Sequence, residues 1–295
     1  MASGYRVNRF GGPEVMVWEA LSLGDLTPQS VRVRVEASGI NFAEVRMRAG
    51  DYSGQELPFI MGMEVAGTIE QVGGEVVDWQ VGDRVFGRAR GAHAEVVDCD
   101  PNHLMPLPAN LSFEQGAAIP VGWLTAWHAL YTVGGMKAGD RVLIEAVGGS
   151  VGSAALALAK QAGCWTLGTA SRDDKLTRAT ANGCDAVVNY TQESVSESAV
   201  NLTNGEGMDI GLMTIGDATA DDLIDSMGMD GRVVMFGSTG GRDITFNLRI
   251  GIPNIQLLSM SISTSPAFMT QTMPDFRTRA LPLFASGELE PAVDT

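Results

Sequence analysis

The sequence predicts an α/β protein in which a doubly wound parallel sheet is combined with a second domain of mostly antiparallel β-structure. Three observations predict this fold class. Up to residue 117, short segments of alternating apolar and polar residues are separated by glycine and proline. From residue 118 on, near-continuous apolar strands alternate with helical segments, which is typical of a parallel sheet covered on both faces. The length of 295 residues fits two domains of ordinary size.

The strands of the first domain follow from a period of two. In Val31-Arg-Val-Arg-Val-Glu36 the valines lie on one face and the charged residues on the other. Segments 64–70, 83–86 and 94–97 repeat the pattern, with breaks at Gly73-Gly74 and Pro101-Asn102. We therefore expect antiparallel strands with few helices in this part of the chain.

The second domain is predicted from the alternation of strands and helices. Helices end where glycine follows a periodic segment, as at Gly183. The expected strands are 141–144, 165–169, 186–189, 209–213, 232–236 and 257–262, and the expected helices are 151–162, 173–182, 191–203 and 217–228.

The composition excludes several classes of partner. Lys and Arg number 20 against 35 Asp and Glu, a formal net charge of −15. A chain this acidic repels nucleic-acid backbones and anionic membranes, so we expect neither as a partner. No apolar run of about 18 residues could span a bilayer, and the first residues lack an apolar signal core. Because the three cysteines are also too few for a disulfide framework, we expect a cytoplasmic protein.

A glycine-rich turn carries the first chemical signal. Ala146-Val-Gly-Gly-Ser-Val-Gly152 lies between an apolar strand and a helix, where a dinucleotide-binding sheet places its pyrophosphate. The spacing Ala-x-x-Gly-x-x-Gly is by itself a weak match, and a plain glycine-rich turn between strand and helix is the alternative. Because the turn opens a βαβαβ unit, we interpret it as a dinucleotide site.

The end of the second strand selects the cofactor. An NAD site needs an acid about 20 residues beyond the glycines, whereas an NADP site needs cations. Ser171 and Arg172 occupy the first positions here, and Lys175 lies one helical turn further. Asp173 and Asp174 are the competing interpretation, but acids are also favoured at the N-terminus of a helix. The pattern favours NADPH.

Longer motifs resemble the medium-chain dehydrogenase/reductase superfamily, and within it the zinc-free quinone oxidoreductase (zeta-crystallin-like) family. The resemblance runs from about residue 5 to the last residue. It implies a GroES-like catalytic domain of residues 1–117 and 256–295 and a Rossmann NADPH-binding domain of residues 118–255. The motifs that carry it are Val35–Val45, Pro58–Gly67, Gly82–Val85, Pro120–Leu130, Ala146–Gly152 and Val188–Tyr190.

The same resemblance argues against a metal. Zinc-dependent members have a ligand Cys where this chain has Asn41, and Gly-His-Glu where it has Gly62-Met63-Glu64. An amide and a thioether do not replace a thiolate and an imidazole in a tetrahedral zinc site. The histidines, His93, His103 and His128, have no partner at ligand spacing. We expect no metal.

The resemblance also implies a set of site residues. Asn41 would approach the nicotinamide end of the cofactor, and Tyr52 would line the substrate cleft and donate a proton or hydrogen bond to a reduced oxygen. A loop tyrosine that packs on its neighbours is the alternative for Tyr52. Relatives commonly have Asp where this chain has Met213, and a second glycine where it has Ser150. The implied cofactor-binding residues are Asn41, Thr125, Gly149, Ser150, Val151, Ser171, Arg172, Lys175, Tyr190, Phe236 and Gly237.

The activity implied by the resemblance is zinc-independent, NADPH-dependent reduction of a quinone. Quinones and conjugated enones accept hydride into a low-lying π system, and the protein supplies mainly position and hydrogen bonds. Two alternatives stay open. One is an enoyl or 2-alkenal reductase that acts on the C=C bond of α,β-unsaturated carbonyls or thioesters, and the other is a non-catalytic NADPH-binding protein. The expected partners are a small-molecule quinone or enone substrate and a second copy of the chain in a homodimer.

The last residues of the chain carry one more expectation. Leu283–Thr295 resembles the helix and turn that precede the closing stretch of the catalytic domain, which relatives complete with a further helix and strand. We therefore expect the C-terminal part of the GroES-like domain to be incomplete here or to be closed in a different way.

Overall fold

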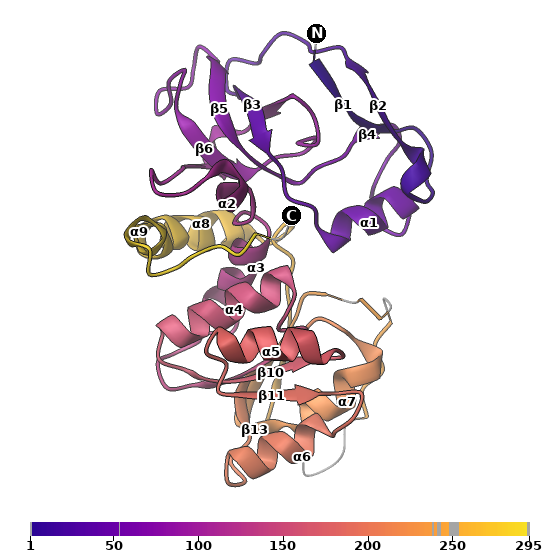
Figure 1. Cartoon of the computed structure of the whole chain (residues 1–295), viewed down its shortest axis with the longest axis vertical. Helices are drawn as coiled ribbons and strands as arrows, with labels where there is room; N and C mark the ends of the chain where they lie inside the picture. Colours follow the sequence, from indigo (N-terminus) through magenta and orange to yellow (C-terminus); the bar gives the residue numbers. More distant parts are fainter. Residues whose placement is uncertain (1, 53, 238, 241–242, 248–253, 294–295) are drawn as a thin grey trace. The chain divides into compact units, whose positions relative to one another are not determined.

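Contacts along the chain divide it into two units, which we describe separately (Figure 1). Unit 1 comprises Met1–Val121 and Arg277–Thr295, and unit 2 comprises Gly122–Phe276. The computed structural model describes residues 2–52, 54–237, 239–240, 243–247 and 254–293.

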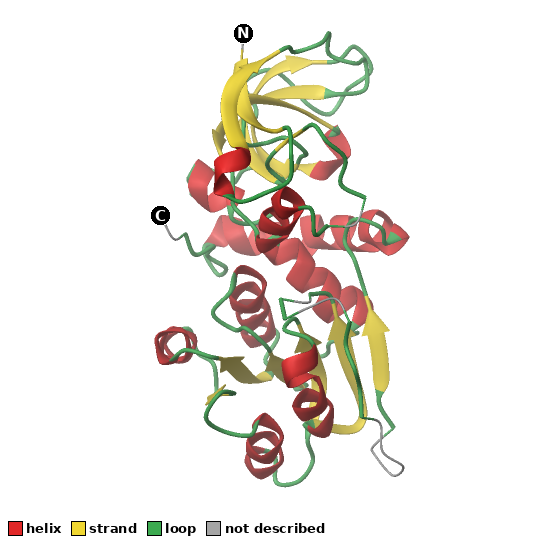
Figure 2. Ribbon diagram, turned by 90° about the vertical axis from the view of Figure 1, so that its right-hand side faces the viewer, coloured by secondary structure: helices red, strands yellow, loops and turns green. Residues whose placement is uncertain are grey.

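Unit 1 is built from antiparallel strands, drawn yellow in Figure 2. The strands are β1 (Ala2–Val7), β2 (Met16–Leu21), β3 (Val31–Ala37), β4 (Phe59–Ile60), β5 (Glu64–Val72), β6 (Arg84–Arg88), β7 (Val96–Cys99) and β8 (Leu104–Pro106). They form a five-stranded sheet in the order β7-β3-β5-β6-β8 and a three-stranded sheet in the order β2-β1-β4. The helices are α1 (Phe42–Ala49), α2 (Phe113–Ala117) and α9 (Leu281–Ser286), with 3-10 helices at Pro13–Val15 and Pro101–His103.

The alternating pattern of β3 sets the packing of the five-stranded sheet. Val31 and Val33 are fully buried, whereas Arg34 is exposed. Val33 pairs with Ile69 of the antiparallel strand β5, and Ile69 is buried as well. The period of two therefore predicted correctly which face of this strand lies in the core.

Unit 2 contains a six-stranded sheet in which every neighbouring pair is parallel. Its strands are β9 (Arg141–Ile144), β10 (Trp165–Ala170), β11 (Ala186–Asn189), β12 (Met208–Met213), β13 (Met227–Met235) and β14 (Gln256–Ser259). Their order, β11-β10-β9-β12-β13-β14, is that of a dinucleotide-binding doubly wound sheet, which confirms the predicted fold class.

Helices connect the parallel strands and cover the sheet. They are α3 (Gly122–Trp127), α4 (Ser150–Gln161), α5 (Asp173–Ala181), α6 (Val195–Leu202), α7 (Asp217–Asp225) and α8 (Met273–Asp275), with π-helices η3 (His128–Val133) and η4 (Phe268–Thr272). The π-helix η5 (Phe276–Ala280) begins at the last residue of unit 2 and continues into unit 1. Figure 1 shows α4 and α5 on one side of the strands and α6 on the other. The helix predicted over 191–203 begins only at Val195, because the Ser194 side chain accepts a hydrogen bond from Glu197 N and caps it.

The boundary between the units differs from the one expected at residue 256. β14 pairs in parallel with β13, and Leu257 lies opposite Val233. Residues 256–276 therefore belong to unit 2 rather than to the antiparallel unit, which receives the chain again only at Arg277. The pairing of β14 with β13 assigns this segment to unit 2. A local residue pattern does not reveal which strand a segment pairs with.

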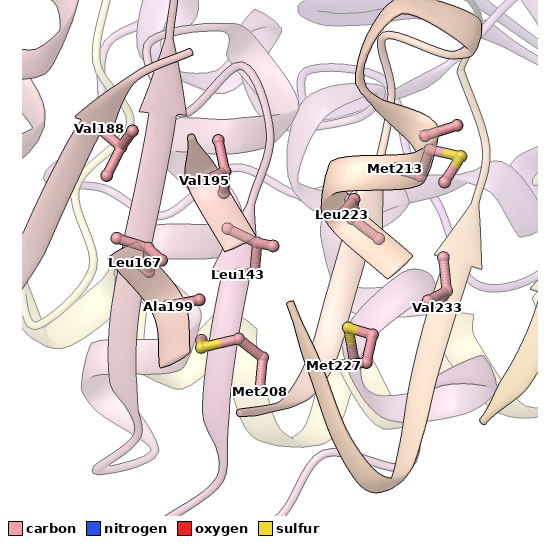
Figure 3. Close-up of a cluster of buried hydrophobic side chains, with 11 residues drawn as sticks. Leu143, Leu167, Val188, Val195, Ala199, Met208, Met213, Leu223, Met227 and Val233 are labelled. Atoms are coloured by element: carbon pink, nitrogen blue, oxygen red, sulfur yellow. The ribbon is translucent and has the colours of Figure 1, made fainter. Parts of the chain in front are cut away.

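One face of the parallel sheet is covered by a cluster of apolar side chains (Figure 3). Leu143 and Leu167 from the strands contact Val195 and Ala199 of α6, and Leu223 belongs to the same cluster from α7. Met213, at the end of β12, is fully buried in this cluster. Within the part of the chain that the structure describes, no helix combines the length and apolar character needed to cross a bilayer.

We predict that Gly152→Ala destabilises unit 2. A Cβ at this position would clash with the carbonyl oxygen of Ala146 and lie 2.8 Å from Val147 Cα, and these backbone atoms have little room to move. The overpacking outweighs the better helix propensity of alanine, so we expect a loss of about 1–3 kcal/mol and a lower unfolding temperature in scanning calorimetry. Gly74→Ala is the control, because nothing lies within 4 Å of that Cβ. Equal unfolding temperatures for the two variants would contradict the close approach at Gly152.

Candidate functional site

In unit 2, the carboxyl ends of the central strands meet at one edge of the sheet. Gly168 of β10 lies opposite Ile144 of β9, and Ala170 lies opposite Asn189 of β11. On the other side of β9, Met213 of β12 lies opposite Met235 of β13. Ligands of doubly wound sheets bind outside this edge, and the predicted cofactor residues that follow these strands all lie there.

The glycine turn connects β9 to α4 at this edge. Val147 N donates to Thr169 O at 3.0 Å, and Gly149 N donates to Ala146 O at 2.8 Å. Ala146 has a φ of 50°, in the left-handed region that L side chains rarely adopt. Gly149 is the N-cap residue of α4, and no side chain caps this end. The first N–H groups of α4, at Ser150 and Val151, therefore lie at the positive end of the helix dipole without a side-chain acceptor.

Ser150 and Thr125 lie on adjoining helices. A Cβ on Gly122 of α3 would clash with Ser150 Oγ, so the serine side chain lies directly beside α3. Thr125 is buried on that same helix. Phe236 and Gly237 follow β13, where Phe236 N donates to Met213 O at 3.3 Å and both residues are half-buried. The structure thus places these predicted residues in the loops and helix that border the edge.

The residues after β10 and β11 form a corner that contains cations and acids. Arg172 binds Asp174 through two hydrogen bonds, from Nε at 2.9 Å and from Nη2 at 3.0 Å. This interaction lowers the pKa of the Asp174 carboxyl. Asp173 accepts a hydrogen bond from Asn189 Nδ2 at 2.7 Å, which joins the start of α5 to the end of β11. Both acids therefore interact with residues of the unit itself.

Lys175 and Tyr190 complete this corner. A Cβ on Gly148 would lie 2.7–3.1 Å from Lys175 Cβ, Cγ and Cδ, so the aliphatic part of the lysine covers the glycine turn. Tyr190 N donates to Ala170 O at 3.3 Å, which places Tyr190 beside Ser171. Unlike Arg172, Lys175 forms no ion pair with the residues that the structure describes.

Glu145, the residue that follows β9, was not among the predicted site residues. Its side chain is 3% exposed and accepts hydrogen bonds from Thr214 N at 2.7 Å, Ile215 N at 2.9 Å and Thr219 Oγ1 at 2.6 Å. Burial raises the pKa of this carboxyl. A charged residue directly after an apolar strand was the signal that could have identified it.

In unit 1, Asn41 lies at the N-terminus of α1 between two buried carboxyl groups. Its main-chain N donates to Glu44 Oε2 at 2.6 Å, as in a capping box. Its side-chain Nδ2 donates to Glu64 Oε1 at 2.6 Å and lies 3.4 Å from Glu44 Oε2. The second oxygen of Glu64 accepts a hydrogen bond from Val121 N at 2.8 Å. Asn41 and Glu64 therefore join three segments of unit 1.

The two carboxyl groups have perturbed acidity. Glu64 is 3% exposed, and burial raises its pKa from 4.5 to about 7. Burial also raises the pKa of Glu44, against the opposing influence of His93, whose Nε2 lies 3.4 Å from Glu44 Oε1. Neither glutamate was predicted as part of the site. For Glu64, its position at the start of a strand with an apolar pattern was an available signal.

Tyr52 is half-buried in the loop that follows α1. Burial lowers the pKa of Arg88, and the opposing electrostatic influences come from Tyr52 and Glu64. Tyr52 is therefore near enough to Arg88 to influence its charge. Its role as a proton donor stays a prediction.

The predicted residues fall into two sets. Asn41 and Tyr52 belong to unit 1, and the other predicted residues belong to unit 2. Among the described residues, no three His, Cys, Asp or Glu side chains are arranged to hold a metal ion.

Two family models match the chain. The model described as alcohol dehydrogenase GroES-like domain matches residues 27–109, and the model described as zinc-binding dehydrogenase matches residues 150–286. The first match lies within unit 1, and most of the second lies within unit 2.

Known proteins are similar over most of the chain. A quinone oxidoreductase of Pseudomonas aeruginosa is 32% identical over 252 residues, which cover 85% of this chain and 78% of that protein. The crystal structure of a Pseudomonas syringae quinone oxidoreductase has a TM-score of 0.89 at 31% identity, over 100% of this chain and 91% of the other. The Escherichia coli quinone oxidoreductase, solved as a complex with NADPH, has a TM-score of 0.86 at 28% identity, over 99% and 90% of the two chains.

We predict that Glu64→Gln reduces the pH dependence of stability. The pKa of Glu64 is higher in the folded chain, about 7, than the 4.5 of an unperturbed carboxyl. Between these values the folded state binds more protons than the unfolded state, so wild-type stability falls as the pH rises from about 4.5 to about 7. The contribution of Glu64 is at most about 3 kcal/mol.

Unfolding temperatures measured between pH 5 and pH 8 test this prediction. The unfolding temperature of Glu64→Gln should fall less steeply with rising pH than that of wild type. Part of the slope should remain, because burial raises the pKa of Glu44 in both proteins. Glu70→Gln, an exposed position on the same strand, is the matched control and should follow wild type. A slope that Glu64→Gln leaves unchanged would be inconsistent with a buried Glu64 of raised pKa.

Proposed function

The chain belongs to the zinc-free quinone oxidoreductase family of the medium-chain dehydrogenase/reductase superfamily, and from this premise we propose that it is an NADPH-dependent quinone reductase. The observation that carries the proposal is the corner beside the glycine turn of unit 2. There, an uncapped N-terminus of α4 lies beside a lysine that has no ion-pair partner among the residues described. This arrangement provides donors for a pyrophosphate and a cation for a 2′-phosphate.

The residues of unit 2 fit NADPH. Gly149, Ser150 and Val151 would bind the pyrophosphate through main-chain N–H groups, because no side chain of the unit caps this helix. Lys175 would bind the 2′-phosphate, with Ser171, Arg172 and Tyr190 around it. Asp173 is already bound to Asn189, so it is poorly available for the 2′-hydroxyl of NAD.

The remaining residues would hold the reacting end. Thr125, Phe236 and Gly237 would border the nicotinamide and its ribose, and the family resemblance assigns Asn41 to the nicotinamide end of the cofactor. NADPH, when bound, supplies a hydride to the acceptor. Tyr52 would donate a proton or a hydrogen bond to the acceptor oxygen as negative charge develops there.

We also propose that the protein is a homodimer in the cytoplasm. In support, β14 is the last strand in the order of the parallel sheet, so one of its edges has no strand partner within the described part of the chain. Light scattering on the purified chain measures the oligomeric state directly, and a monomer at micromolar concentration would contradict the homodimer.

We predict that the chain binds NADPH more tightly than NADH and that Lys175→Ala removes this preference. Loss of a charge-assisted contact with a phosphate should weaken NADPH binding about tenfold and leave NADH binding nearly unchanged. Titration followed by nicotinamide fluorescence measures both dissociation constants. Lys137→Ala, an exposed lysine of the same unit, is the control and should bind both cofactors as wild type does. Equal weakening of both cofactors by Lys175→Ala would place this lysine away from the 2′-phosphate.

An acceptor panel separates the proposed activity from its alternatives. We expect NADPH oxidation with simple quinones and little turnover of enals or enoyl thioesters. Turnover of enals or thioesters in place of quinones would identify a reductase of conjugated C=C bonds. Tight NADPH binding without turnover of any acceptor would identify a non-catalytic binding protein.

A further inference from the structure

The side chain of Asn41 is oriented by carboxyl groups that can only accept hydrogen bonds when ionised. Nδ2 lies 2.6 Å from Glu64 Oε1 and 3.4 Å from Glu44 Oε2. An ionised carboxylate has no proton to donate, so the nitrogen of the amide, and not its oxygen, must face this pair. Asn41 Oδ1 then lies on the opposite side of the amide. The Glu44 main-chain N–H donates to the Asn41 main-chain oxygen at 3.0 Å and also faces the Asn41 side chain in the capping box, so Oδ1 keeps a lone pair for a further donor.

Glu64 cannot turn away from Asn41. Its second oxygen is bound to Val121 N at 2.8 Å, and Ser38 Oγ donates to its carbonyl oxygen at 2.8 Å. Gly39 packs directly on the carboxyl group, because a Cβ at that position would clash with Oε1 and lie 2.8 Å from Cδ. The carboxyl is therefore held between one main-chain donor and one side-chain donor.

From this arrangement we propose that Glu64 is a positioning residue that sets the hydrogen-bonding polarity of Asn41, so that its oxygen is presented to an N–H or O–H donor of the bound nicotinamide half of the cofactor. The inference rests on the proposed function, because Asn41 must face the cofactor. It adds that Asn41 acts as an acceptor. An amide held in this way cannot donate to a quinone oxygen.

The charge of Glu64 determines which end of the amide is presented. Val121 N donates to Glu64 Oε2 and needs this acceptor whether Glu64 is ionised or neutral. When Glu64 is protonated, the proton is therefore on Oε1, the oxygen that faces Asn41. The neutral acid then donates to Asn41, and the amide turns over to accept with Oδ1. The groups that face Glu64 are Asn41 and Glu44 from α1 and Arg88 from β6, while His93 lies against Glu44 and Tyr52 near Arg88. A pKa of about 7 places this change in an accessible pH range.

Glu64→Gln provides a nearly isosteric inversion of this polarity. In this variant the Val121 N–H binds the oxygen of the new side-chain amide, which leaves the nitrogen of that amide facing position 41. Asn41 then accepts with Oδ1 and presents its nitrogen outward, exchanging the longer contact with Glu44 Oε2 for the shorter one with position 64. In the double variant Asn41→Asp/Glu64→Gln, one oxygen of the carboxylate at position 41 accepts a hydrogen bond from the amide at position 64. The other oxygen is presented outward. An outward acceptor is thereby restored without a change in net charge.

The first test follows the amide itself in the cofactor-free protein. In ¹⁵N spectra, the side-chain signals of Asn41 are identified by their loss in Asn41→Asp. We expect them to shift with a midpoint near pH 7 in wild type and in Glu70→Gln, and to lose this transition in Glu64→Gln. Asn41 signals that do not respond to pH around this value in wild type would overturn the inference, whatever the enzyme catalyses.

The second test measures binding of NADPH and of 2′,5′-ADP, which contains only the adenosine half. Glu64→Gln should weaken NADPH binding about tenfold, the size of one lost hydrogen bond, and the double variant should recover most of this loss. Binding of 2′,5′-ADP should stay the same in all variants. Equal weakening of both ligands, or no recovery in the double variant, would assign Glu64 a merely structural role. Failure of wild type to bind NADPH would instead refute the proposed function.

Discussion

A carboxylate that is removed from water must be hydrogen-bonded, and in this chain that constraint joins segments that carry the predicted site residues. Glu64 binds Val121 N and the Asn41 side chain in unit 1. Glu145 binds two main-chain N–H groups and the Thr219 hydroxyl in unit 2. Each glutamate joins the end of a strand to a loop or helix far away in the sequence. Loss of either carboxylate would leave its buried donors without an acceptor. The loops that carry these donors are therefore held with little freedom.

The corner of unit 2 formed by the residues after β10 and β11 is organised by weaker interactions between more exposed groups. Asp173 joins α5 to the end of β11 through Asn189, and Asp174 holds Arg172 in a pair whose side chains are more than half exposed. An exposed pair of this kind contributes only about 0–1 kcal/mol, so a phosphate can compete with Asp174 for the arginine. Lys175 requires no such exchange because its stem already lies over the glycine turn and its ammonium has no ion-pair partner among the described residues.

Local patterns predicted most of the fold, because periodicity and strand–helix alternation act over a few residues. They located β3, β5 and the parallel strands of unit 2, together with the edge at which the glycine turn lies. They could not locate the partners of buried charges. Asn41 and Glu64 are 23 residues apart, and Glu145 and Thr219 are 74 residues apart, so neither pair leaves a local signal. The same limitation misplaced the boundary at residue 256, since only the pairing of β14 with β13 shows to which unit that segment belongs.

The pairing of Glu145 also accounts for an apolar residue at the end of β12, where the resemblance leads one to expect Asp. Met213 is fully buried among apolar side chains, and a carboxylate there would need donors nearby. The donors of the following turn, Thr214 N and Ile215 N, are already bound to Glu145 from the neighbouring strand β9. A second carboxylate beside the first would be disfavoured, because neighbouring like charges repel each other. The acid that this turn requires is therefore supplied from β9, and an apolar residue at position 213 is the consistent choice.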